Sequence, residues 1–451
     1  MAKRRKRKVI LIGISVLLVA AFIFLRPILL IATGYAAKHA CSCYFLQGRE
    51  LDEIAKSDLN FSVLPQVGIS LAEDNGGVQA SMFGLFKREA RYITGQGCTL
   101  INDASITVPA LAPTPMPPPD TVVQDIDFEL TELDSLGIDA GLLAEAVDYG
   151  MAPVKGGGAR AVLVIKDGQL LAESYAEGYD KDTPLLGWSM TKSITGLLVG
   201  MAGLEPEQDH LFPEWENDRR SEITIDNLLT MSSGLKWTER YGASTHATHM
   251  LHRTPDFAAY ARSQSLAEEP GEQFIYSSGT SNMLMQLFLE QFPDHQAGID
   301  FIYEKLFHPI GAYSFRIEHD QSGKLVGSSY GWATARDWAR VGQLVLQNGR
   351  WGERQIVDSE WINYLRKSVC TRPAHKPDKA ESEECNYGGH FWLKSVEEPN
   401  MPDDAILMRG FQDQRVIILP TQNMLIVRLG HNEDKAADFD GLVERVLKSV
   451  L

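Results

Sequence analysis

The chain has 451 residues, of which 44% are hydrophobic and 23% charged, and its formal net charge is -16. This length suits one large domain with accessory segments, and the composition is that of a folded globular protein. Residues 3–8 are all basic and leave the rest of the chain near -22, so its surface repels the phosphate backbone of nucleic acid. We therefore expect no nucleic-acid partner.

The N-terminal segment joins this basic cluster to a long apolar run, VILIGISVLLVAAFIFL, from Val9 to Leu25. An Arg-Pro pair interrupts the run before ILLIATGYAA resumes it, so residues 1–37 are long enough to cross about 30 Å of hydrocarbon. We predict a signal anchor in the membrane, with the rest of the chain in the periplasm or outside the cell. Small residues at Gly34 and Ala36 suit a signal peptidase and leave secretion after cleavage as the alternative.

The five cysteines fit an oxidising compartment. Cys370 and Cys385 flank a charged, proline-containing segment, and closing a loop of that length would stabilise the fold by about 3 kcal/mol. Cys98 is expected to pair with Cys41 or Cys43, which leaves one thiol over.

The Pro-rich stretch VPALAPTPMPPPD, residues 108–120, is typical of a stiff extended linker. It divides a small cysteine-containing region, residues 38–107, from a main domain, residues 121–451. No role for the small region follows from its sequence.

Strand patterns stand at both ends of the main domain. ARAVLVIKDGQLLAESY contains two apolar runs on either side of Asp167-Gly168, a strong hairpin signal. Residues 405–430 show further strand-like runs broken at 420–423, and a helical pattern follows from Phe439 to Val450. Helical stretches lie between the two ends, at 225–231, 281–292 and 333–347. This order predicts an α+β fold whose antiparallel sheet takes strands from both ends of the domain, with a helical region inserted.

The segment GWSMTKSITGLLVGM, residues 187–201, places Ser189 three residues before Lys192. Its apolar residues follow helical spacing, and the serine and lysine lie about 60° apart, away from the centre of that stripe. Gly196 and Gly200 share their side, which predicts the close approach of another element.

Enclosure would disfavour the charged form of this lysine, so its amine would act as a base beside a nucleophilic hydroxyl. The N-terminus of the helix would help to stabilise an oxyanion at Ser189. The alternative is a serine that merely begins the helix and a lysine that reaches solvent.

Metal chemistry is not indicated. The run HATHMLH places His246, His249 and His252 three residues apart, but no carboxylate or cysteine completes a metal shell there. A solvated helix face is expected, and we predict that no metal or organic cofactor is needed.

The Ser-x-x-Lys segment resembles that of the serine β-lactamase and penicillin-binding DD-peptidase superfamily. ITIDNLLTMSSGLKW, FIYSSGTSNML, SSYGWATARDWARVGQLVLQNGRW and RGFQDQRVIILP resemble later segments of the same superfamily, so the likeness covers roughly residues 150–450. It is greatest for the branch that contains class C β-lactamases, serine esterases and aminohexanoate-dimer hydrolases. The resemblance implies the β-lactamase/DD-peptidase-like fold.

By position, the resemblance makes Ser189 the acylated nucleophile and Lys192 the group that takes or shares its proton. Tyr276 would relay a proton to the leaving group, as the tyrosine of the family's Y-x-N motif. Ser278 stands where that motif has asparagine and keeps a hydrogen-bonding group.

The third family motif, K-T-G, is replaced by M-R-G at 408–410, so Arg409 offers a different charge. Gly410 and Phe411 would form a strand edge, and the Phe411 N–H would pair with that of Ser189 as an oxyanion hole. Asp413, close by, would disfavour an anionic substrate unless Arg409 neutralises it. Recognition of a penicillin carboxylate is therefore not expected.

Together these features predict an extracytoplasmic serine hydrolase that cleaves an amide or ester of a small-molecule or peptide-like substrate through an acyl-serine intermediate. Two alternatives remain open: a β-lactamase or peptidoglycan DD-peptidase, and a catalytically inactive binding module on the same fold.

Overall fold

The computed structural model describes residues 2–110, 112, 133, 137–242, 244–369, 372–373 and 386–450; for residues 2–23 and 372–373 it describes the backbone only. The chain forms two compact units. Unit 1 takes in Met1–Tyr92, Cys98–Ile106 and Glu239–Pro255, and unit 2 takes in Ile93–Gly97, Thr107–Thr238 and Asp256–Leu451. Most of the predicted linker, and both Cys370 and Cys385, lie outside the described residues.

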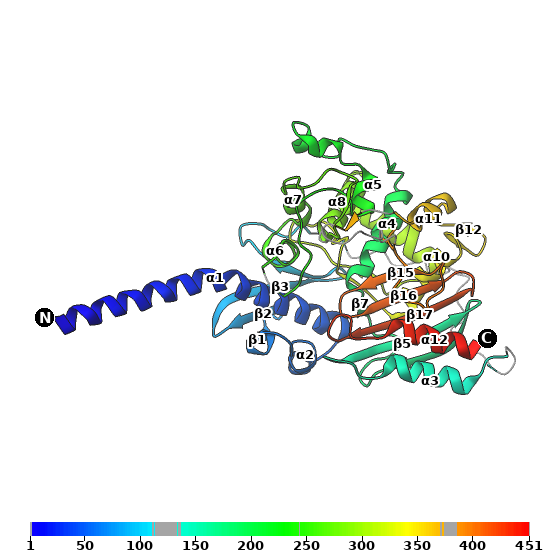
Figure 1. The fold of residues 1–451 in the computed structure, drawn as a ribbon, viewed down its shortest axis with the longest axis horizontal. Coiled ribbons are helices and arrows are strands. Elements are labelled where there is room, and N and C mark those ends of the chain that lie inside the picture. Colours follow the sequence, from blue (N-terminus) through cyan, green and yellow to red (C-terminus); the bar gives the residue numbers. More distant parts are fainter. Residues whose placement is uncertain are drawn as a thin grey trace. The chain divides into compact units, whose positions relative to one another are not determined.

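Unit 1 is built on a long helix, α1 (Ala2–Gln47), drawn in dark blue in Figure 1. Several residues of its second half are small and fully buried, among them Ala36, Ala37 and Ala40, so other elements approach its backbone closely there. It packs against a sheet of order β1-β2-β3-β4 and against two short helices. These elements are β1 (Val67–Leu71), β2 (Gly77–Met82), β3 (Leu85–Ile93), β4 (Gly97–Ile101), α2 (Leu51–Ser57), α6 (His246–Arg253) and the 3-10 turn η1 (Leu64–Gln66).

The predicted membrane anchor falls on α1. In the helices whose side chains are described, no segment is long and apolar enough to cross a membrane. The side chains of residues 2–23, most of the predicted anchor, lie outside that set.

One predicted disulfide is present in unit 1. Cys41 is bonded to Cys98, with their Cα atoms 6.1 Å apart. This confirms one of the two pairings expected for Cys98 and leaves Cys43 as a buried, reduced thiol.

Helix α6 does not have the solvent-exposed histidine face that the sequence predicts. Its chain segment joins unit 1, and Ala247, Met250 and Leu251 are buried on it. His252 is also buried, so the prediction of a solvated histidine face is wrong at this position.

Unit 2 is organised around a six-stranded sheet of order β14-β15-β16-β17-β5-β6 in which neighbouring strands are antiparallel. The strands are β5 (Gly158–Lys166), β6 (Gln169–Tyr175), β14 (Trp392–Leu393), β15 (Ile406–Gly410), β16 (Gln414–Leu419) and β17 (Met424–His431). The hairpin turns at Asp167 and Gly168, whose φ angles of 53° and 75° suit a two-residue turn. Strands from both ends of the main domain thus share one sheet, as predicted.

Helices cover both faces of this sheet. Ile417 and Ile426 belong to a core that α3 (Ala140–Met151) and α12 (Phe439–Val450) complete, and these two helices run side by side in Figure 1. Their sequence neighbours Val416 and Leu425 instead lie against α10 (Ala335–Leu346). Because successive side chains of a strand point to opposite faces, α10 covers the other face.

The inserted helical region carries the candidate site. Its helices are α4 (Thr191–Met201), α5 (Ile225–Leu229), α7 (Phe257–Arg262), α8 (Ser278–Leu289), α9 (His295–Phe301) and α11 (Ser359–Leu365). The shorter turns are η3 (Trp188–Met190), η4 (Pro213–Trp215), η5 (Arg219–Glu222), the π-helical η6 (Ile302–Phe307) and η7 (His308–Ile310). The short strands form sheets β7-β10-β9, β11-β12 and β13-β8: β7 (Leu185–Leu186), β8 (Gln273–Phe274), β9 (Arg316–Ile317), β10 (Gly331–Ala333), β11 (Arg350–Trp351), β12 (Arg354–Gln355) and β13 (Arg372–Pro373).

Candidate active site

Ser189 lies in a tight turn between a strand and a helix. The turn η3 follows β7 and leads directly into α4. Trp188, just before the serine, has a φ of 47°, a left-handed conformation that costs a bulky residue about 1–2 kcal/mol. Hydrogen bonds hold the turn in place: Gly187 N–H donates to the Gly331 carbonyl (2.9 Å), and the Thr191 hydroxyl donates to the Trp188 carbonyl (2.8 Å). The surrounding fold thus maintains a strained backbone beside the candidate nucleophile.

The two glycines of α4 have the close neighbours that the sequence predicts. A Cβ atom on Gly196 would lie 3.1 Å from the carbonyl oxygen of Gly389, and one on Gly200 would overlap the ring of Trp361 in α11. The Trp361 indole also donates to the Gly196 carbonyl (2.9 Å). These contacts enclose the helix that carries Lys192.

Lys192 links the predicted residues of the site. Its Nζ lies 2.9 Å from the hydroxyl oxygen of Ser189, 3.0 Å from that of Ser278 and 3.0 Å from the carbonyl oxygen of Ser328. The lysine is 1% exposed and Ser189 is 8% exposed. These three partners are uncharged. A neutral amine has two N–H donors and one lone pair, so it can donate to Ser278 and Ser328 and accept the proton of Ser189.

Helix α8 fixes the other side of this amine. It begins at Ser278, and the Ser277 hydroxyl caps it by accepting the N–H of Thr280 (3.2 Å). One turn along, the Asn282 amide donates to the Ser278 carbonyl (3.0 Å) and to the Ser328 hydroxyl (3.1 Å). The Asn282 amide therefore links Ser278 and Ser328, two of the partners of Lys192. No sequence pattern marks Ser328, because its contribution is a main-chain carbonyl.

Tyr276 is brought to the same lysine. The Lys192 Nζ lies 5.0 Å from the centre of its ring, within the range of a cation–π contact. The ring also packs against Trp392 (centroids 5.3 Å apart) and Tyr387 (6.1 Å). The relay of a proton by its hydroxyl remains a prediction.

Arg409 is paired with Glu398, an acidic residue that no sequence motif marks. Its Nη2 donates to both carboxylate oxygens of Glu398, at 2.9 and 2.7 Å, and its guanidinium lies 5.3 Å from the Trp392 ring centre. Burial lowers the pKa of Arg409, and Glu398 and Tyr276 oppose that shift. The carboxylate of Glu398 therefore balances the positive charge of Arg409, which stands where the family motif has lysine.

The end of β15 lies against the turn that holds Ser189. A Cβ atom on Gly410 would overlap the carbonyl oxygen of Gly187, so only a glycine permits this approach. The Phe411 ring packs edge-on against Trp188 (5.7 Å), whose indole donates to the Gln412 side chain (3.2 Å). Gly410 and Phe411 thus lie beside the serine, and their part in an oxyanion hole remains a prediction.

Asp413 does not have the environment expected for it. It is 1% exposed and accepts the N–H groups of Lys435 (2.8 Å), Ala436 (2.9 Å) and Ala437 (2.8 Å), and the amide of Asn432 (2.8 Å). The buried carboxylate therefore holds the loop of residues 432–437 in place. Arg409 pairs with Glu398 and does not neutralise Asp413. The effect of Asp413 on an anionic substrate remains a prediction.

His390 is a further buried group beside the site. One ring nitrogen lies 2.8 Å from the Leu229 carbonyl and the other 2.8 Å from the Ser281 hydroxyl. Burial lowers the pKa of His390 to about 3, and the nearby Lys192 adds to the shift. The imidazole is therefore neutral at physiological pH. No local sequence pattern pointed to this residue.

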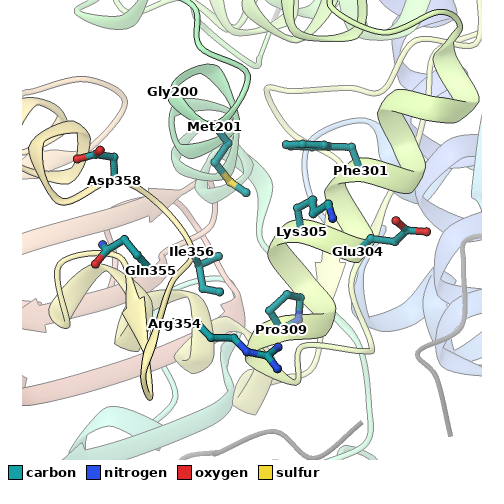
Figure 2. Close-up of a pocket in the computed structure, with 10 residues that line it drawn as sticks. All are labelled: Gly200, Met201, Phe301, Glu304, Lys305, Pro309, Arg354, Gln355, Ile356 and Asp358. Atoms are coloured by element: carbon teal, nitrogen blue, oxygen red, sulfur yellow. The ribbon is translucent and has the colours of Figure 1, made fainter. Parts of the chain in front are cut away.

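A cavity of about 750 Å³ lies at the opposite end of α4 from Ser189 (Figure 2). The C-terminal end of α4 and two segments, 301–309 and 354–358, supply the ten residues that line it. The predicted site residues are not among them. This cavity is therefore separate from the site around Lys192.

Comparison with known proteins agrees with this geometry. The sequence profile of the beta-lactamase family matches residues 144–447. The chain belongs to the beta-lactamase family of serine hydrolases. The predicted superfamily and its α+β fold are thereby confirmed. No match was found among curated protein sequences.

Several solved structures share the fold of this beta-lactamase family member. One is a protein from Bacillus anthracis provisionally named a 6-aminohexanoate-dimer hydrolase. It is 19% identical to this chain with a TM-score of 0.55, and the match covers 73% of this chain and 86% of that one. A penicillin-binding protein homologue from Caulobacter crescentus has 14% identity and a TM-score of 0.55, over 73% and 100% of the two chains. A class C beta-lactamase in complex with cefoxitin has 14% identity and a TM-score of 0.52, over 69% and 99%.

Proposed function

We propose that this chain hydrolyses an amide or ester bond through an acyl intermediate on Ser189. The observation that carries the proposal is the 2.9 Å contact between the Ser189 hydroxyl and the buried Nζ of Lys192. The hydroxyl oxygen attacks the substrate carbonyl while its proton passes to the amine. The proton then moves, through the Tyr276 hydroxyl, to the leaving amine or alcohol. Attack by water releases the acid and restores the serine.

The substrate we propose is uncharged near the reacting carbonyl. Two aromatic groups adjoin the site: Trp188 with Phe411, and Tyr276 with Trp392. Aromatic surfaces of this kind favour apolar acyl or leaving groups. Because Arg409 already binds Glu398 through both carboxylate oxygens, a substrate carboxylate would have to displace that ion pair. A penicillin or cephalosporin carries such a carboxylate.

We also propose that the enzyme acts outside the cytoplasm and is held at the membrane by residues 1–37, with secretion after cleavage as the alternative. The disulfide between Cys41 and Cys98 supports an oxidising compartment.

The substrate proposal is tested by steady-state kinetics on matched esters that differ only in a terminal carboxamide or carboxylate, with a chromogenic cephalosporin as a third substrate. We expect kcat/KM to favour the carboxamide ester over both anionic substrates by at least about tenfold, or about 1.4 kcal/mol. Glu398→Gln keeps the shape of the side chain but leaves Arg409 unbalanced, so it should reduce this preference. Faster cephalosporin turnover would indicate a β-lactamase, and no turnover of any substrate would indicate a binding module.

A further inference from the structure

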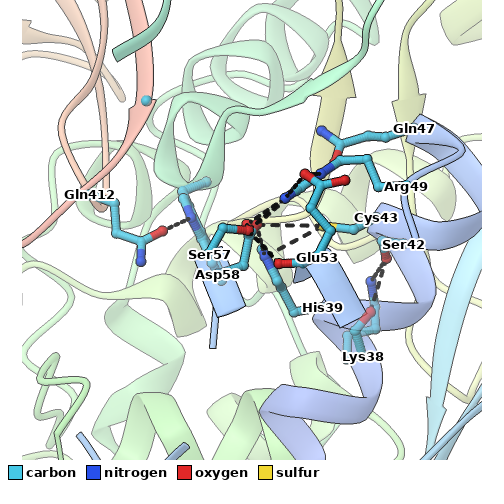
Figure 3. A network of polar contacts seen from close by, with 12 residues as sticks. Lys38, His39, Ser42, Cys43, Gln47, Arg49, Glu53, Ser57, Asp58 and Gln412 are labelled. Carbon is cyan, nitrogen blue, oxygen red and sulfur yellow. Dashed lines mark hydrogen bonds and ion pairs between the residues drawn. The ribbon is translucent and has the colours of Figure 1, made fainter. Parts of the chain in front are cut away.

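A second cluster of reactive side chains lies in unit 1 and includes none of the residues assigned to the candidate active site. His39 and Cys43 are one turn apart on α1, and Asp58 directly follows α2. The exposed fractions are 5%, 0% and 0%, so all three are buried. Figure 3 shows their side chains pointing toward one another. We propose that these three residues bind a zinc ion.

The distances between their ligand atoms support this assignment. His39 Nε2 lies 2.9 Å from Asp58 Oδ2 and 3.5 Å from Cys43 Sγ, and Cys43 Sγ lies 3.8 Å from Asp58 Oδ2. A point about 2 Å from all three atoms therefore exists, and zinc binds nitrogen and oxygen at about 2.0–2.2 Å and sulfur at about 2.3 Å. A small outward movement of the ion from the plane of the three atoms reaches these lengths.

The carboxylate has the outer hydrogen bonds that metal ligands usually have. Asp58 Oδ1, the oxygen that faces away from His39, accepts from the Arg49 guanidinium (2.9 Å) and from the Ser57 hydroxyl (2.8 Å). The second oxygen, Oδ2, also lies 3.2 Å from Nη1 of the same guanidinium. These bonds hold the carboxylate in one orientation, and Oδ2 keeps a further lone pair for the metal. Arg49 also offsets part of the negative charge that the site gathers when the thiol ionises.

A cysteine–histidine nucleophile pair fits the same residues less well. In such a relay the carboxylate binds one ring nitrogen and the other nitrogen faces the nucleophile. Here Asp58 and Cys43 both face Nε2 of His39. Three different donor atoms that converge on one point are the arrangement of a metal shell. A nitrogen, a sulfur and an oxygen ligand together suit zinc and its usual spectroscopic substitute, cobalt.

Binding follows a simple proton balance. Zinc displaces the thiol proton of Cys43, which is released to solvent, and a zinc–thiolate bond forms. The neutral imidazole binds through Nε2 and keeps its proton on Nδ1, and Asp58 binds as a carboxylate. The ion would join α1 to the chain after α2, in the same unit as the Cys41–Cys98 disulfide.

The test uses the full chain, purified in detergent without a histidine tag and stripped of metal with a chelator. Titration with Co²⁺ should produce the near-ultraviolet charge-transfer band of a thiolate ligand, and Zn²⁺ titrated by calorimetry should bind at one ion per chain. Cys43→Ser should abolish the band and weaken zinc binding at least about 100-fold, with circular dichroism confirming its fold. His39→Gln should weaken zinc binding similarly.

The matched control is His249→Gln, which changes a half-buried histidine of α6 in the same unit. It should leave the stoichiometry and affinity for zinc unchanged. A missing charge-transfer band with the wild-type chain would overturn the proposal, and so would zinc binding that Cys43→Ser does not weaken. Neither readout depends on hydrolase activity.

Discussion

The contact between Ser278 and Lys192 gives a sharp test of how the site is organised. Ser278→Ala removes a hydroxyl oxygen that lies 3.0 Å from the lysine Nζ at a fully buried position. A buried donor that loses its partner costs about 1–3 kcal/mol. If that cost is felt in the transition state for acylation, kcat/KM falls by about 5-fold to 150-fold.

The control lies one turn along the same helix. Ser281 is equally buried, but its hydroxyl lies 2.8 Å from a nitrogen of His390. Ser281→Ala and Ser278→Ala should therefore lower the free energy of unfolding by similar amounts in urea titrations. Single-turnover acylation by a chromogenic ester, measured across pH, should be slow only for Ser278→Ala. Ser278→Thr restores the hydroxyl and should recover part of the rate.

Two results would refute this reasoning. The first is an acylation rate for Ser278→Ala within twofold of wild type. The second is an equal loss of rate in Ser281→Ala, which would show that the effect comes from helix stability and not from the position of the lysine amine.

Three further predictions concern stability. Gly200→Ala should lower the free energy of unfolding by about 1–3 kcal/mol, because the added methyl overlaps the Trp361 ring. His390 has a pKa of about 3 in the folded chain, so the unfolded chain binds its proton first as the pH falls below 6.5. Its contribution to stability is complete above pH 6.5 and is lost toward pH 3, by about 2 kcal/mol at pH 5, and His390→Gln should show less of this loss in urea titrations. Removing the Cys41–Cys98 bond, which joins residues 57 apart, should cost about 4 kcal/mol by the loop-entropy relation, measured with and without a reductant.

The first of these predictions has a matched control variant. Gly141→Ala, near the start of α3, has only the flexible Asp139 side chain near its added methyl and should not destabilise the chain. An equal effect at Gly141 and Gly200 would exclude the overlap as the cause. An unchanged acid sensitivity in His390→Gln, or an unchanged stability under reducing conditions, would contradict the other two predictions.

Local sequence patterns predicted much of this molecule. Asp167-Gly168 marked the turn of a hairpin, and apolar runs marked the strands on either side. The three-residue spacing of Ser189 and Lys192 predicted their contact, because two residues one helical turn apart meet whatever the rest of the fold does. Glycines on their side of the helix predicted close neighbours for the same reason.

The features that were missed depend on contacts between distant parts of the chain. The Ser328 carbonyl binds Lys192 across 136 positions, and any residue type supplies a carbonyl. Glu398 is an ordinary acidic residue until the fold brings it to Arg409. Asp413 was assigned to the site because it follows Gly410 closely, whereas a turn with positive φ at Gln412 and Asp413 directs its carboxylate into the next loop.

The central claim is that the amine of Lys192 activates the hydroxyl of Ser189. Intact-mass spectrometry after incubation with a neutral acyl ester or a fluorophosphonate tests it most directly. We predict one covalent adduct per wild-type chain, none on Ser189→Ala, and strongly slowed formation on Lys192→Ala. Equal labelling of wild type and Ser189→Ala, or full-rate labelling of Lys192→Ala, would contradict the claim.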